Sequence, residues 1–156
     1  MASKPMKTRE LSGELLQRAS EFHGHGGPFL VVGLRLGQRA LKDLDASGWF
    51  DLRCRAHLKL SPPDSCVLDG IQVATGCTMG KMNLEASDGE GVSVEFTGER
   101  GTETIELRGD AYREIKRRLG EAGKADHLVR RLTEASDEDL FIVRFTLAKS
   151  PAAPRA

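Results

Sequence analysis

The first fifty residues carry two helical patterns of apolar positions. Thr8 suits an N-cap, and apolar residues follow it at intervals of three or four: Leu11, Leu15, Ala19 and Phe22. A second pattern starts at Pro28, which suits a first helical turn, and ends near Gly48. Its repeating positions are Leu30, Leu34, Gly37, Leu41 and Leu44. The glycine-rich segment FHGHGG separates the two patterns, so we expect two helices with a sharp break between them.

A period of two then replaces the helical period. Apolar and polar residues alternate strictly over 52–60, which predicts a strand with Cys54 toward the core and His57 toward water. Further strands are expected around 81–86, 92–96 and 102–107. Turns at Asp88-Gly89 and at Gly98 and Gly101 separate them, so we expect these strands to pair antiparallel. The same alternation over 141–147 predicts a final strand.

Three shorter helices complete the predicted fold. Pro62 and Pro63 end the first strand, and Asp64 or Ser65 can cap a helix over 66–74. Helical spacing recurs at 111–119 and 125–132. We therefore predict an α+β fold, with helices packed on a mixed, mostly antiparallel sheet of about four to five strands. It forms a single domain over residues 8–149, and the Pro-, Ala- and Ser-rich ends, 1–7 and 150–156, are expected to be flexible.

Composition narrows the classes of function. The chain has 156 residues, enough for one domain with one core. Its 23 basic and 23 acidic residues balance, which disfavours binding to nucleic acid or to a membrane surface. No apolar run approaches a membrane span, and the start lacks the apolar stretch of a signal peptide. We expect a cytoplasmic protein that binds a small polar ligand or a protein partner.

Histidine and cysteine supply the candidate chemistry. His23 and His25 stand two residues apart among glycines, which lets both imidazoles turn toward one point; solvent-exposed or helix-capping histidines are the alternative. Cys66 is expected at the start of a helix, where backbone N–H groups favour its thiolate, and Cys77 in a glycine-flanked turn. Their spacing is not that of a zinc ribbon, and two buried structural cysteines fit the pattern equally well.

These segments together resemble a known family. FHGHGGP, then CVLDGIQ and TGCTMGKMNL, are similar to the motifs of the E-subunit family of formylmethanofuran dehydrogenase. That family carries His-Gly-His-x-Cys-Pro and later Cys-x-x-Asp-x-Ile-Gln with Thr-Gly-Cys-Thr-x-Gly-Lys-x-Asn-Leu. The resemblance spans roughly residues 8–148 and is thinner after Leu84. It implies a mixed α+β domain, a homodimer, and association with molybdenum or tungsten dehydrogenase subunits of one-carbon metabolism.

The resemblance also implies a site. Carried onto this chain, the family's metal ligands are His23, His25, Cys66 and Cys77, and zinc is the cofactor that this donor set favours. Five polar residues occupy the family's pocket positions: Asp69, Gln72, Thr78, Lys81 and Asn83. The chain departs from the family at Gly27, where the family has cysteine, and it ends without the C-terminal zinc ribbon that many relatives carry.

Three functions are consistent with these residues. The first is a zinc-binding domain with an accessory or sensing role beside a dehydrogenase. The second is an independent zinc-dependent enzyme acting on a small anionic or one-carbon substrate, with the metal activating water or polarising a carbonyl. The third is a metal-free partner-binding module, which the loss of a soft ligand at Gly27 favours.

Overall fold

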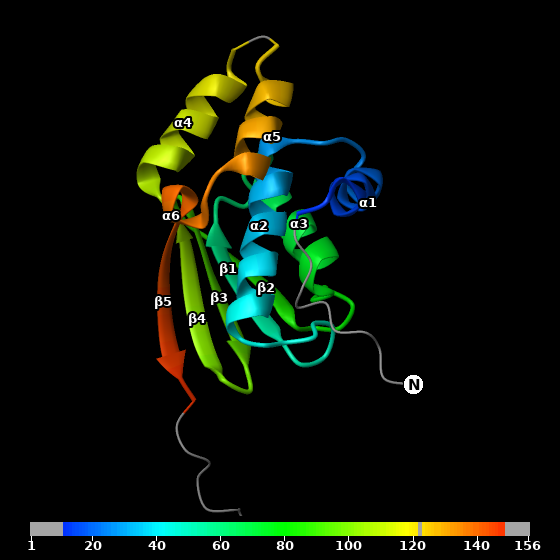
Figure 1. Ribbon diagram of the computed structural model, residues 1–156, viewed down its shortest axis with the longest axis vertical. Coiled ribbons are helices and arrows are strands. Elements are labelled where there is room, and N and C mark those ends of the chain that lie inside the picture. Colours follow the sequence, from blue (N-terminus) through cyan, green and yellow to red (C-terminus); the bar gives the residue numbers. More distant parts are fainter. Residues whose placement is uncertain (1–10, 122, 149–156) are drawn as a thin grey trace, which may run out of the picture.

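A computed structural model describes residues 11–121 and 123–148 (Figure 1). It contains six helices: α1 (Gly13–His23), α2 (Pro28–Asp43), α3 (Cys66–Thr75), α4 (Gly109–Leu119), α5 (Ala125–Glu134) and α6 (Asp137–Leu140). Its five strands are β1 (Arg53–Leu58), β2 (Leu84–Asp88), β3 (Val92–Gly98), β4 (Gly101–Leu107) and β5 (Phe141–Leu147). The predicted α+β class is confirmed. The proposed Thr8 cap and both predicted flexible ends lie outside the described residues.

The five strands form one mixed sheet in the order β2-β1-β3-β4-β5. Three neighbouring pairs are antiparallel, which makes the sheet mostly antiparallel as predicted, and one of them, β3–β4, is a predicted pairing. β2 instead pairs parallel with β1, Cys54 opposite Leu84. The expectation that the strand after α3 pairs antiparallel with its successor was therefore wrong. Asp88 and Gly89 do not close a hairpin, because β1 lies between β2 and β3. A parallel neighbour needs a crossover, and α3 supplies it.

Helix boundaries differ from the predictions at two ends. Ser12 caps α1, since its hydroxyl accepts a hydrogen bond from the Leu15 N–H at 3.1 Å. α2 ends at Asp43 instead of continuing to Gly48. The Leu44 N–H still bonds the Ala40 carbonyl at 2.9 Å, but Asp45 adopts a left-handed φ of 50°, which turns the chain out of the helix.

α2 is the centre of the core and packs against α3 through glycines. Eleven of its sixteen residues are buried. A Cβ atom added at Gly70 would lie 2.7 Å from the Leu34 nitrogen and closer still to the Leu30 carbonyl oxygen. Gly33 on α2 meets α3 backbone in the same way, and a Cβ at Gly37 would lie 2.7 Å from that of Ala74. The two helices thus touch backbone to backbone, which sets the close spacing between α2 and α3.

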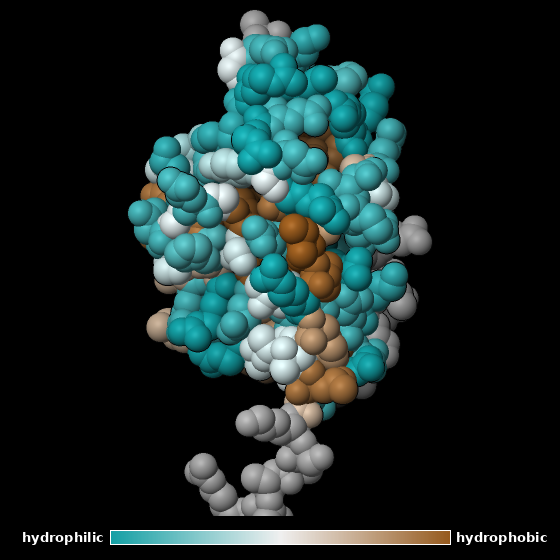
Figure 2. All heavy atoms as spheres, turned by 90° about the vertical axis from the view of Figure 1, so that its left-hand side faces the viewer, coloured by the Kyte–Doolittle hydropathy of each residue, from teal (hydrophilic) through white to brown (hydrophobic). Residues whose placement is uncertain are grey.

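The sheet has one covered and one open face. Along β1, Cys54, Ala56 and Leu58 are buried while the alternate residues, including His57, are exposed, as the sequence predicted. The β5 edge is less covered: Phe145 is 41% exposed and Leu147 is 70% exposed. The face of the molecule on which β5 lies shows apolar atoms amid mostly hydrophilic ones (Figure 2).

A carboxylate of the central sheet lies inside the core, and the described part of the chain gives it no hydrogen-bond partner. Glu103 on β4 is fully buried, and neither of its oxygens has a hydrogen-bond partner among the described residues. Burial and the neighbouring Asp43 carboxylate raise its pKa from 4.5 to about 8, although Arg39 partly opposes this. Arg39 itself is bound by Asp43 and Asp137, so its charge is already matched.

The acidic segment before β5 is structured. Asp137 begins α6 and accepts hydrogen bonds from Arg35 at 2.8 Å and Arg39 at 2.9 Å, which ties α6 to α2. Within residues 11–121 and 123–148, no helix is long and apolar enough to span a membrane.

Candidate functional site

The end of α1 and the first turn of α3 meet through His23 and Asp69. His23 is the last residue of α1, and Gly24 stops the helix with a left-handed φ of 100°. The His23 Nδ1 atom lies 2.5 Å from Asp69 Oδ2, and the two side chains are 11% and 34% exposed. A carboxylate at Nδ1 holds the proton there in the neutral imidazole, which leaves the lone pair of the ring on Nε2.

The Nε2 atom of His23 is the atom of the site that points to a bound partner. It is buried, and it has no hydrogen-bond partner among the described residues. Buried polar atoms in native proteins nearly always have a partner, so an unpartnered one points to an ion, a water or a ligand. An imidazole that a carboxylate orients from behind is the usual arrangement of a histidine metal ligand.

A cavity of about 370 Å³ adjoins this pair. Its polar lining comes from His23, Asp69, Cys66, Ser65 and Gln72. Its apolar lining consists of Pro62, Leu68, Met79, Leu84 and Ala86. Leu84 and Ala86 belong to β2, so the unpredicted parallel pairing is what places a strand edge along the cavity. The cavity therefore combines polar donor groups with an apolar wall.

Cys66 lines the cavity as the first residue of α3. Burial, followed by the Asp69 and Asp64 carboxylates, raises the pKa of its thiol, and a hydrogen bond from its own backbone N–H opposes this only in part. The helix start thus favours the thiolate as the sequence suggested, but burial and the two carboxylates outweigh it. A bound cation would reverse the balance, because it deprotonates a coordinating thiol.

Asp64 anchors the segment that leads into α3. The side chain is fully buried and accepts hydrogen bonds from Lys116 Nζ at 2.7 Å and the Tyr112 hydroxyl at 2.5 Å. Burial acts to raise the pKa of Asp64, but these two hydrogen bonds outweigh it and lower the pKa below its ordinary value. The sequence suggested only a cap here. Nothing in the local pattern pointed to partners on α4, about fifty residues later.

His25 lies beside this arrangement but does not line the cavity. Its ring centroid is 4.8 Å from that of His23, and the side chain is exposed. Gly27, the N-cap of α2, lies against it: a Cβ at Gly27 would be 3.1 Å from His25 Cε1. The two histidines are thus neighbours, as the His-x-His pattern suggested.

Cys77 lies apart from the cavity. It is fully buried, and its Sγ donates to the Leu52 carbonyl at 3.4 Å. Burial raises the pKa of Cys77, and it raises that of the buried Cys54 more strongly. The structure brings together His23, Cys66 and Asp69 around one space. It does not bring Cys77 to that space.

The predicted pocket residues divide into two groups. Gln72 lines the cavity, and its amide lies 3.4 Å from Asp69 Oδ1. Asn83 instead accepts from the Thr78 N–H at 2.9 Å and donates to the Trp49 carbonyl, while Lys81 Nζ donates to the Thr78 hydroxyl at 3.3 Å. Thr78, Lys81 and Asn83 therefore shape the loop that carries Met79 and do not line the cavity.

The donor atoms around the cavity fit a metal ion only in part. In the part of the chain that the structure describes, no three His, Cys, Asp or Glu side chains are gathered closely enough to hold one. His23 Nε2 fits the role of a ligand, and Cys66 lines the same space. A third protein donor at that point requires a side-chain rotation, for which the exposed His25, beside His23, is a candidate.

Comparison with known proteins defines the class and then the family. The fold is similar to that in the crystal structure of a tungsten formylmethanofuran dehydrogenase E-subunit-like (FmdE-like) protein from Syntrophus aciditrophicus. The two share a TM-score of 0.64 and 19% identity, over 96% of this chain and 78% of the other, so the likeness concerns the fold alone. Residues 22–142 match the model of the FmdE family, described as "Molybdenum formylmethanofuran dehydrogenase operon". The chain belongs to the FmdE family.

A curated relative matches part of the chain. The "Probable S-adenosyl-L-methionine-binding protein" of Archaeoglobus fulgidus is 41% identical over 76 residues. The match covers 45% of this chain and 19% of that protein, so the similarity concerns about a fifth of the relative's length.

Proposed function

We propose that the chain is a zinc-binding domain with an accessory or sensing role related to the E-subunit family of formylmethanofuran dehydrogenase. The observation that supports metal binding is the buried, unpartnered Nε2 of His23, whose ring is oriented by Asp69. Cys66 would supply sulfur from the same cavity, and His25 would supply a second nitrogen by turning toward His23. Imidazole and thiolate form the donor set that zinc prefers.

The fourth predicted ligand stays a prediction. Cys77 would have to leave its hydrogen bond to Leu52 and its place in the core to reach the ion. A site of His23, His25 and Cys66 would keep an open position toward the cavity, and three protein ligands with an open fourth position are the arrangement of catalytic zinc sites. The bound metal would act there as a Lewis acid, while Asp69 holds the proton on His23 Nδ1 and the apolar wall limits water.

We expect His23→Gln to remove bound zinc. Wild-type protein should carry about one zinc per chain by elemental analysis, and the variant close to none, because Nε2 is the preformed donor. Asp69→Asn should keep the metal but weaken its affinity about 10- to 100-fold in a chelator competition, since the imidazole loses its orienting carboxylate.

The matched control is His57→Gln. His57 is exposed on the open face of the sheet and bonds Ser87, and neither residue lines the cavity, so zinc content should not change. Wild-type protein that is metal-free and takes up no zinc when titrated would overturn the proposal and leave the metal-free partner module. Cys77→Ala tests the remaining ligand: retained zinc with lower stability would place Cys77 in the core only.

A pull-down tests the accessory role. The family's operon association leads us to expect that the tagged chain copurifies with a molybdenum or tungsten dehydrogenase subunit, identified by mass spectrometry. The His23→Gln variant serves as the comparison, and equal recovery with both would separate partner binding from metal binding. Recovery of no such subunit from cells that express one would contradict the role. The expected homodimer stays a prediction.

The independent enzyme is the second candidate, and the cavity favours it. A space of about 370 Å³ next to the proposed open metal position has room for a small substrate. Turnover by the zinc-loaded protein alone, lost in His23→Gln, would distinguish this function from an accessory one.

A further inference from the structure

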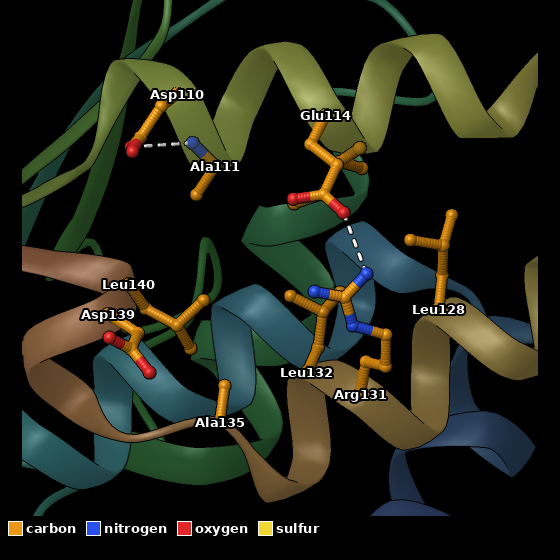
Figure 3. Close-up of a pocket in the computed structure, with 10 residues that line it drawn as sticks. Asp110, Ala111, Glu114, Leu128, Arg131, Leu132, Ala135, Asp139 and Leu140 are labelled. Atoms are coloured by element: carbon orange, nitrogen blue, oxygen red, sulfur yellow. Dashed lines mark hydrogen bonds and ion pairs between the residues drawn. The ribbon is translucent and has the colours of Figure 1, made fainter.

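A second cavity shares no lining residue with the proposed zinc site. It measures about 300 Å³ and is enclosed by α4, α5 and α6 (Figure 3). Its apolar lining comes from all three helices and the residue that follows α5: Ala111, Ile115, Leu128, Leu132, Ala135 and Leu140. Ile115, Leu128, Leu132 and Leu140 are each at most 5% exposed, so the floor of this cavity is core hydrocarbon.

The charged residues at the rim are mostly acidic. Asp110, Glu114 and Asp139 contribute carboxylates, and Arg131 contributes one cation. Arg131 already forms an ion pair, since its Nη1 donates to Glu114 Oε1 at 2.7 Å across the cavity (Figure 3). Arg118 reaches the same oxygen at 3.3 Å. Glu114 therefore has two cations, and no basic group among the lining residues is left for the other carboxylates.

Asp110 and Asp139 remain without a cation. Among the described residues neither forms an ion pair, and the Asp110 side chain is engaged only by the Ala111 N–H at 2.8 Å. The two lie toward one end of the cavity in Figure 3, and Leu128 lies toward the other. The cavity thus pairs an acidic end with a hydrocarbon floor.

We propose that this cavity binds a small organic ammonium ion, with the charged head between Asp110 and Asp139 and the aliphatic body on the α4–α5 floor. The charge complements the unpaired carboxylates, and apolar burial supplies the rest of the affinity. The volume lies at the small end of ligand sites, which fits a short aliphatic body better than a long one. The site uses no residue of the zinc proposal, so each can fail alone.

The test uses three probes with the same six-carbon body: n-hexylammonium, hexan-1-ol and hexanoate. Binding to the full chain is followed by backbone amide shifts in NMR. We expect n-hexylammonium to shift residues of α4, α5 and α6 and to bind about five- to twenty-fold more tightly than hexan-1-ol, because two exposed carboxylates each contribute modestly. Hexanoate should bind most weakly.

A charge-matched pair of variants decides between a site and general attraction. Asp110→Asn with Asp139→Asn should abolish the preference for the ammonium over the alcohol. Asp126→Asn with Glu138→Gln removes the same charge from positions of α5 and α6 that do not line the cavity, and should keep the preference. Equal affinity for ammonium and alcohol in wild type, shifts outside α4–α6, or equal loss in both double variants would overturn the proposal.

Discussion

Gly70→Ala should destabilise the fold by about 3 kcal/mol, measured as the free energy of unfolding in urea. The added Cβ would lie 2.7 Å from the Leu34 nitrogen and overlap the Leu30 carbonyl, and these are backbone atoms that cannot rotate away. Overpacking of this kind typically costs about 1–3 kcal/mol, and more where backbone must shift. The change should also move Cys66 and Asp69, since both lie on α3.

Helix propensity makes the sign of this result informative. Alanine is favoured over glycine inside a helix by about 1 kcal/mol, so propensity alone predicts a gain at Gly70. Gly13, the first residue of α1, has no atom within 4 Å of a built Cβ and serves as the control. Gly13→Ala should leave stability unchanged or raise it slightly. A stable Gly70→Ala variant would contradict the backbone contact between α2 and α3.

Glu103→Gln should remove a loss of stability that wild-type protein shows between pH 5 and pH 8. The pKa of Glu103 is about 8 in the folded chain and ordinary, near 4.5, in the unfolded one. Between these values the folded state binds more protons, so the free energy of unfolding falls as pH rises. At about 1.4 kcal/mol per pH unit the full effect is bounded near 4 kcal/mol, and we expect roughly 3.

Other shifted groups act outside this window. The pKa values of Asp64 and Asp137 are lowered, so their contribution is present above their unfolded values and is lost only in stronger acid. The cysteine pKa values are raised above 9.0, so the cysteines act only in alkali. The difference between wild type and Glu103→Gln in chemical unfolding at pH 5, 6, 7 and 8 therefore reports the contribution of Glu103. Glu106→Gln, on the opposite face of β4, should keep the wild-type slope, and a Glu103→Gln variant that also keeps it would refute the assignment.

The sequence predicted local structure more successfully than strand pairing. Alternation over 52–60 gave β1 with Cys54 inside and His57 outside, because a half-buried strand imposes that period directly. The position of β2 could not be read in this way. Residues 84–88 lie at an edge with only Leu84 buried, so their pattern does not say which strand they join. Pairing depended on the α3 crossover, which packing against α2 decides.

The candidate site likewise has parts that local sequence signals predicted and parts that depend on the tertiary fold. His23 and Cys66 were predicted from motif and helix ends, and both line the cavity. The pairing of His23 with Asp69 joins residues 46 positions apart, and the walls of Leu84 and Ala86 depend on the β2 pairing, so no local signal showed them. Cys77 looked free in a glycine-flanked turn. Its burial follows from packing under Leu52, which only the folded molecule reveals.

The parallel β1–β2 pair has a kinetic consequence. Nine of the ten residues that line the cavity lie between Pro62 and Ala86, but their placement depends on distant partners. β2 pairs with β1 thirty positions earlier, Cys54 opposite Leu84, and His23 reaches Asp69 from 46 positions away. Contacts between distant segments require loop closure before they give any stabilisation, so they form late during folding. Helices α2 and α3 can associate early through their glycines. A competent metal pocket should therefore appear only in the final phase of refolding, after most far-ultraviolet circular dichroism has returned.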